Sequence, residues 1–79
     1  MKLSKAQRLA LGVMSVRPIK ALECFSVQWH AHEPGIRRAT LESLKKLSLC
    51  TEKRKTEMPW IHYLYTITPA GLAAIGSAK

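Results

Sequence analysis

The residues of this chain best suited to chemistry are positively charged and close together in the sequence. Residues 37 to 55 contain seven of them: Arg37, Arg38, Lys45, Lys46, Lys53, Arg54 and Lys55. Set against Glu42 and Glu52, they leave this segment with a net +5, out of +8 for the whole chain. Residues 56 to 79 have no net charge, because Lys79 offsets Glu57. Such a concentration favours binding to a polyanion, nucleic acid or an anionic membrane surface, over a general solubilising role.

Other kinds of site have weaker support. His30, His32 and Glu33, with Cys24 and Cys50 elsewhere, are residue types that bind zinc, but structural zinc sites pair their ligands in two compact motifs and only one such pair is present. We therefore interpret the histidines as turn residues and the cysteines as small buried thiols. The five acidic residues are scattered glutamates, and no catalytic Ser/His or Cys/His motif or glycine-rich phosphate loop is present. We expect a protein that is not an enzyme and needs no cofactor or metal.

Length and composition indicate the class of protein. A chain of 79 residues that is 47% hydrophobic and 23% charged predicts one globular domain over residues 1–79, with no deep pocket for a small-molecule substrate. Two cysteines are too few for a disulfide framework, which favours a cytoplasmic protein. The uncharged stretch 58–78 is interrupted by prolines and glycines, so it cannot span a membrane, and the N-terminus lacks the pattern of a signal peptide. We expect no membrane partner.

Apolar periodicity predicts four helices. Their ranges are about 4–15, 18–26 and 35–47, followed by a short helix that begins at Thr68-Pro69. Ser4 is expected to cap the first helix, and Thr68 the last one. The second helix rests on the apolar stripe of Ile19, Leu22 and Phe25. Residues 27–35 show no sustained period and end in Pro34-Gly35, which predicts a turn.

A β-hairpin is expected between the third helix and the last one. Its predicted parts are a strand over 49–53, a polar turn over 54–57 and a strand over 60–67. Alternation places Ile61, Tyr63, Tyr65 and Ile67 on one face, where we expect them to close the core. In the alternative interpretation, Trp60, Tyr63 and Tyr65 form a platform on which single-stranded bases stack. Trp29 is expected in the core or at an interface.

Two stretches of this sequence resemble a known family. Residues 38–49, Arg-Ala-Thr-Leu-Glu-Ser-Leu-Lys-Lys-Leu-Ser-Leu, are similar to a recognition helix that leads into a strand. Tyr65, Ile67, Thr68 and Gly71 have the spacing of the Tyr-x-Leu-Thr-x-x-Gly motif that ends the wing in many bacterial winged helix-turn-helix DNA-binding domains. The chain departs from that family at Ser48, where a glycine is usual. The resemblance implies an α+β winged helix-turn-helix fold, with three helices followed by a β-hairpin wing and a short C-terminal helix.

The expected function is binding of double-stranded DNA, because the major groove admits one α-helix with a cationic face. On the third helix, Arg38 and Lys46 are candidates for contacts to guanine, Glu42 for cytosine and Ala39 for a thymine methyl group, with Ser43 also on the outward side. Arg37 and Lys45 are placed for phosphates. Lys53, Arg54 and Lys55 are expected at the hairpin tip, along the DNA backbone or in the minor groove. This hypothesis requires the helix cations and the tip cations to face the same side.

Such a protein would be a small bacterial, plasmid or phage transcriptional regulator or an architectural accessory. A homodimer is possible, with the first helix and the face from Leu72 to Ile75 as candidate contacts. Two other functions stay open: a protein-interaction module on a winged-helix scaffold that docks an acidic partner, and a basic domain associated with RNA.

Overall fold

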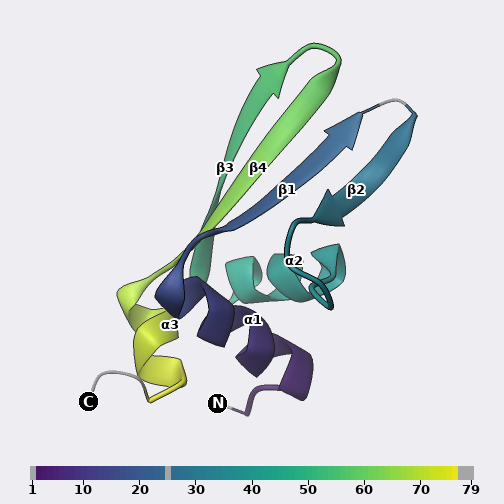
Figure 1. The fold of residues 1–79 in the computed structure, drawn as a ribbon. Helices are drawn as coiled ribbons and strands as arrows, with labels where there is room; N and C mark the ends of the chain where they lie inside the picture. The colour runs from purple at the N-terminus through teal and green to yellow at the C-terminus, as the bar shows by residue number, and fades with distance from the viewer. Residues whose placement is uncertain (1, 25, 77–79) are drawn as a thin grey trace.

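The computed structural model describes residues 2–24 and 26–76, which form three helices and a four-stranded antiparallel sheet (Figure 1). The elements follow one another as α1 (Lys5–Val16), β1 (Ile19–Cys24), β2 (Val27–Ala31), α2 (Arg38–Lys46), β3 (Cys50–Glu57), β4 (Trp60–Ile67) and α3 (Pro69–Ala74). The strands lie side by side in the order β2-β1-β4-β3, so the first strand of one hairpin pairs with the second strand of the other. The α+β class expected from the sequence is confirmed.

The second predicted helix is wrong. Ile19–Cys24 is the strand β1, which pairs with β4 on one side and with β2 on the other. Ile19 and Ala21 are buried while Lys20 between them is exposed, the period of a strand. A segment this short fits a helical and an extended pattern equally well, and the two neighbouring strands decide between them. Phe25, the third member of the predicted stripe, lies outside the described residues.

The segment predicted as a turn, 27–35, is also partly wrong, because Val27–Ala31 forms β2. Trp29 and Ala31 pack against the core, and Trp29 meets Tyr65 edge to face with ring centroids 6.4 Å apart. The order of elements is therefore helix, two strands, helix, two strands, helix. It differs from three helices followed by a hairpin, and the winged helix-turn-helix arrangement is not confirmed.

The other predicted helices and both strands of the predicted hairpin are present. Ser4 caps α1 through a capping box with Gln7, and Thr68 caps α3 by accepting a hydrogen bond from the Gly71 N–H at 3.0 Å. β3 runs through the predicted turn 54–57, so the hairpin turns at Met58-Pro59 instead. Cross-strand pairing continues as far as Glu57 and Trp60, which explains why this polar segment is extended.

The turn between α2 and β3 places Ser48 in an unusual backbone conformation. Ser48 has φ 62°, in the left-handed region where glycine is the usual residue. The backbone N–H of Leu49 then reaches the Leu44 carbonyl at 2.9 Å, which closes the end of α2. Ser48 thus adopts a backbone conformation that a glycine would adopt without strain.

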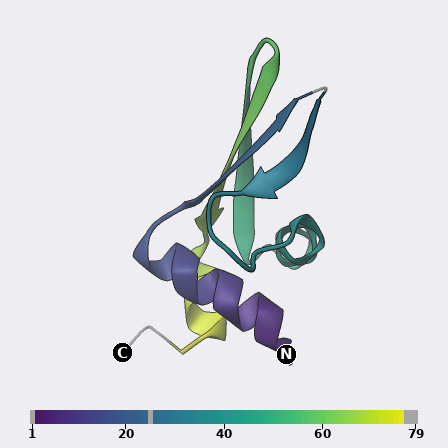
Figure 2. The same ribbon diagram turned by 45° about the vertical axis from the view of Figure 1, so that its right-hand side comes forward.

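The helices pack on one face of the sheet, the inner face. The largest fully buried side chains come from the helices and from this face of the sheet: Leu11, Ile19, Leu41, Leu44 and Tyr65. Ile61, Tyr63, Tyr65 and Ile67 point to the inner face and contribute to the core, as expected. In two views the hairpins extend well beyond the helices (Figures 1 and 2), and the molecule measures 41 × 20 × 19 Å.

Candidate nucleic-acid interface

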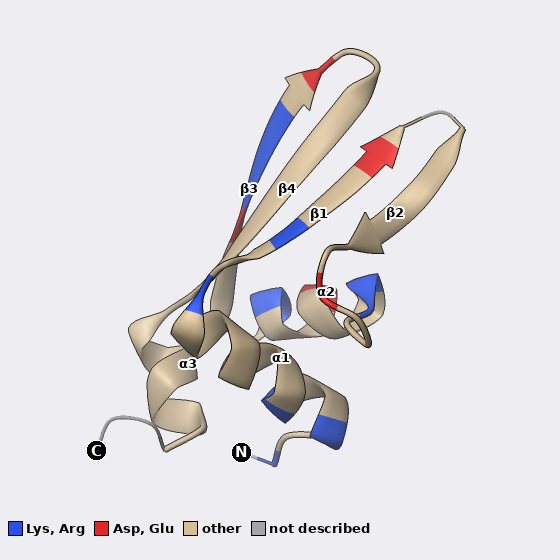
Figure 3. Cartoon of the chain, viewed as in Figure 1, with Lys and Arg blue, Asp and Glu red and all other residues tan. Residues whose placement is uncertain are grey.

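Lys and Arg residues are spread over α1, α2, β1 and β3, whereas β2, β4 and α3 carry none (Figure 3). Two of the predicted DNA contacts, Arg38 on α2 and Arg54 on β3, meet on the inner side of the sheet. Their guanidinium carbons lie 5.5 Å and 5.0 Å from the centre of the Tyr63 ring. Arg38 and Arg54 therefore lie on the same side of the sheet.

Both arginines, however, have carboxylate partners within the protein. Arg38 Nη1 lies 3.5 Å from Glu23 Oε2, and Arg54 Nη2 lies 3.2 Å from Glu52 Oε2. Lys45 Nζ lies 2.9 Å from Glu52 Oε1 and 3.2 Å from Glu42 Oε1. We call the six residues the α2–sheet network: Glu23, Arg38, Glu42, Lys45, Glu52 and Arg54. It holds three positive and three negative charges, so it fastens α2 to the sheet and adds no net charge.

The titration of this network reflects its ion pairs. Burial alone would raise the pKa of the Glu52 carboxyl, but hydrogen bonds and charges from Lys45 and Arg54 outweigh burial and lower that pKa. Hydrogen bonds to Glu52 and then Glu42 raise the pKa of Lys45 in turn. These shifts favour the charged forms, which is the behaviour of a structural ion-pair cluster.

The other predicted contacts on α2 divide into two groups. The Ser43 hydroxyl accepts a hydrogen bond from Gln7 Nε2 at 3.1 Å and donates one to the Thr40 carbonyl at 2.7 Å. Ser43 therefore lies at the contact with α1, and its predicted position on the outward side of the helix is wrong. Arg37, Ala39 and Lys46 are exposed, as predicted.

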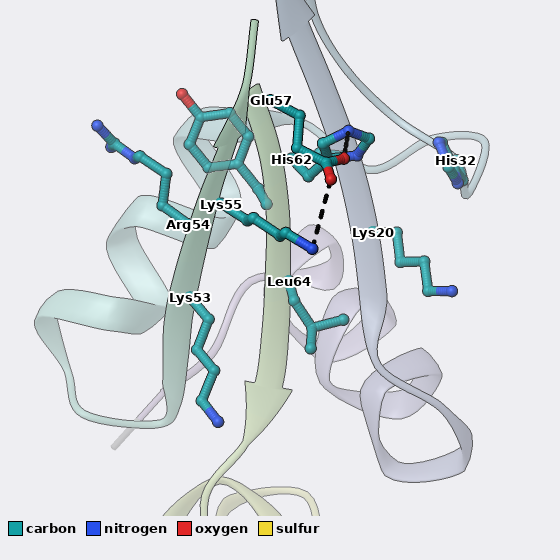
Figure 4. A pocket seen from close by; sticks show the side chains of 10 residues that line it. Lys20, His32, Lys53, Arg54, Lys55, Glu57, His62 and Leu64 are labelled. Atoms are coloured by element: carbon teal, nitrogen blue, oxygen red, sulfur yellow. Dashed lines mark ion pairs between the residues drawn. The ribbon is translucent and has the colours of Figure 1, made fainter. Parts of the chain in front are cut away.

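Lys53 and Lys55 are separated from Arg54 by the sheet. Successive residues of a strand point to opposite faces, so the two lysines point to the outer face while Arg54 points to the inner one (Figure 4). These three residues are in the body of β3, with the turn further on at Met58-Pro59. Their predicted position at the hairpin tip is wrong, and the seven cations do not form one continuous surface.

The outer face carries a cationic pattern that extends across the strands. Strand register places two rows of four side chains there, His32, Lys20, Leu64 and Lys53 in one and His30, Leu22, His62 and Lys55 in the other. Six of the eight are lysine or histidine, and none is acidic. None of the helices of the described residues packs on this face. We call the eight side chains the outer-face rows.

Part of the outer-face rows borders a shallow hollow of about 500 Å³, which Lys20, His32, Lys53, His62 and Leu64 help to line (Figure 4). Glu57 stands at its distal edge, where its carboxylate oxygens lie 3.4 Å from Lys55 Nζ and 3.2 Å from His62 Nε2. With neutral histidines, the three lysines and this glutamate give the face a net charge of +2. Such an open, positively charged surface suits an extended anion better than an enclosed small molecule.

Sequence reasoning missed this surface apart from Lys53 and Lys55. The spacing of His30-x-His32 and Lys53-x-Lys55 is a local sign that each pair shares one face of a strand. The alignment of these pairs with Lys20 depends on the register of four strands, which no local pattern specifies.

Other proposed sites find little geometric support. Glu33 pairs with Arg17 at 2.7 Å, and the rings of His30 and His32 are 6.4 Å apart. Within residues 2–24 and 26–76, no three His, Cys, Asp or Glu side chains are grouped closely enough to hold a metal ion.

The described helices include none long and apolar enough to cross a membrane. Of the candidate dimer contacts, α1 exposes Leu9 and Val16, whereas Ile75 packs against the core.

Comparison with known proteins identifies no relative, since no family model, no curated protein and no solved structure matches this chain.

Proposed function

We propose that this protein binds double-stranded DNA with the outer face of its sheet, and acts as a small transcriptional regulator or architectural accessory in the cytoplasm. The observation that carries the proposal is the alignment of lysines and histidines in the outer-face rows, on a sheet face that the described helices leave uncovered. The α2 surface is the weaker candidate, because Arg38 and Lys45 are already held by carboxylates.

The spacing of the rows suits contacts to separate phosphates. Lys20 and Lys53 flank Leu64 in one row, so about 10 Å separates their backbones, given the usual spacing between strands. Lys53 and Lys55 are two residues apart on β3, a separation of about 7 Å. Each lysine that neutralises a phosphate releases counterions, which supplies most of the affinity of a protein that binds DNA without regard to sequence.

The aromatic residues favour a duplex over a single strand. Proteins that bind single strands stack successive bases on aromatic side chains. Here Tyr63 and Tyr65 are buried on the opposite face, so Trp60 is the one member of the predicted platform that lies on the outer face. A duplex needs no such platform, because lysine contacts to its phosphates supply affinity without base stacking.

The proposal is tested by fluorescence anisotropy with a labelled duplex of 24 base pairs at 50 to 200 mM salt. The sheet variant carries Lys20→Gln, Lys53→Gln and Lys55→Gln. If each lysine meets one phosphate, the slope of log affinity against log salt becomes less negative by about 2.7, so the ratio of wild-type to variant affinity changes about 40-fold across this range.

A helix variant with the same loss of charge is the control. It carries Lys5→Gln, Arg37→Gln and Lys46→Gln, all at exposed positions away from the outer face. We expect its salt slope to stay close to that of the wild type. An equal or larger loss in the helix variant would place binding on the helices, and equal wild-type affinity for a single strand or an RNA duplex would refute the choice of double-stranded DNA.

A further inference from the structure

The free end of the β3–β4 hairpin is apolar, which is unusual for an exposed turn. Met58 keeps 76% of its surface exposed and Trp60 keeps 37%, and Pro59 between them is also exposed. We call these three residues the hairpin tip. Met58 and Pro59 border a small hollow of about 270 Å³ that Cys24 and Ile61 also line, and neither Met58 nor Pro59 is part of the hydrophobic core. Turns at such positions usually carry polar residues, and exposed apolar groups that lie together mark interaction sites.

The hairpin tip is continuous with the outer-face rows. Trp60 is two residues before His62 on β4, and alternation places both side chains on the outer face. Trp60 also pairs across the hairpin with Glu57, whose carboxylate is already engaged by Lys55 and His62. In both views the hairpin end lies far from the helices, which leaves its approach to a partner open (Figures 1 and 2).

We propose that the hairpin tip is a wedge that inserts Met58, supported by Pro59 and Trp60, into a base step of the bound duplex and bends the DNA. This inference rests on the proposed function, because the outer-face lysines hold the duplex against the tip. Methionine and proline are among the apolar side chains that separate base pairs in this way. Insertion buries the exposed side chain, and the bend brings more of the DNA backbone onto the sheet.

The preferred DNA sequence follows from how easily a base step is unstacked. Pyrimidine–purine steps such as TA unstack and kink most easily, whereas A-tracts are stiff. The tip would therefore select a deformable step by the energy of distortion, without hydrogen bonds to the bases. A duplex with a central TA step should bind about tenfold more tightly than an A-tract duplex of the same length, a ratio within the range of bending energies.

The experiment combines two measurements on a duplex of 30 base pairs that is bound by the wild-type protein. Dyes at the two ends report bending by energy transfer, and 2-aminopurine beside the TA step brightens when its neighbour is unstacked. We expect the wild type to bend the duplex by about 20–90° and to raise the 2-aminopurine signal. Met58→Ser should keep the steep salt dependence of binding but lose most of both signals.

The matched control is Val16→Ser at the end of α1. Val16 is 77% exposed and Met58 is 76% exposed, so each substitution replaces a largely exposed apolar side chain by serine, and Val16 lies on a helix instead of at the hairpin tip. Val16→Ser should leave bending and unstacking unchanged. The outcomes separate the two proposals. Wild-type binding without either signal, or signals that persist in Met58→Ser, would overturn the wedge alone, while the absence of duplex binding would overturn the proposed function and the wedge with it.

Discussion

Gly71, the last residue of the motif that resembles a winged-helix wing, gives the most direct test of how the last helix is seated. A Cβ built at this position would overlap the backbone carbonyl oxygen of Leu49 and would lie 2.7 Å from Ile67 Cγ1. The Leu49 oxygen cannot easily withdraw, because it accepts a hydrogen bond from the Thr68 N–H at 3.1 Å. Gly71→Ala must therefore displace α3 from the sheet.

The expected cost follows from this overlap. Overpacking against fixed atoms costs about 1–3 kcal/mol, and a rigid backbone contact belongs at the upper end of that range. The better helix propensity of alanine returns no more than about 1 kcal/mol. We expect Gly71→Ala to lower the free energy of unfolding by about 2 kcal/mol and the melting temperature by about 10 °C for a domain of this size.

Gly12 on α1 provides the matched control. Apart from its chain neighbours and the backbone of α1, a Cβ at Gly12 would have no atom of the described chain within 4 Å, so Gly12→Ala should stabilise the protein by up to about 1 kcal/mol. Urea unfolding followed by circular dichroism at 222 nm measures both variants under one set of conditions. The decisive result is the opposite sign of the two shifts. Wild-type stability in Gly71→Ala would refute the close seating of α3 against Leu49.

Two further predictions concern groups whose pKa is shifted. Burial raises the pKa of the Cys50 thiol to about 11, whereas at Cys24 hydrogen bonds from Ser26 and the Val27 N–H outweigh desolvation and lower the pKa. At pH 7.5, iodoacetamide should therefore alkylate Cys24 at least about 100-fold faster than Cys50, and mass spectrometry that finds equal rates would contradict the burial of Cys50. The lowered pKa of Glu52 stabilises the fold above the ordinary carboxylate pKa of about 4.3, and this stabilisation is lost as the pH falls toward the lower folded value. Glu52→Gln should be less stable than the wild type at pH 7 and should lose less stability on acidification, as followed by thermal melts between pH 7 and 2; parallel curves would show that the α2–sheet network contributes nothing to acid sensitivity.

Local patterns were sufficient for much of this fold. The capping residues Ser4 and Thr68, the buried face of α2 and the inward face of β4 depend on neighbours within a few residues along the chain. Helix period and strand alternation depend only on residues that are close together in the sequence, so these elements could be predicted. The concentration of positive charge between residues 37 and 55 is likewise a property of the sequence alone.

The tertiary structure decided which of those charges remain available. Arg38 is held by Glu23, fifteen residues earlier in the chain, on a strand that local periodicity assigned to a helix. Lys20 and Lys53 share a row only because β1 and β3 both pair with β4. Strand pairing over such separations is set by how the whole sheet buries one face, and a shift of one residue would turn every side chain of a strand to the other side. The amount of charge was therefore encoded locally, while its division between an internal network and an open surface arose from contacts between distant parts of the chain.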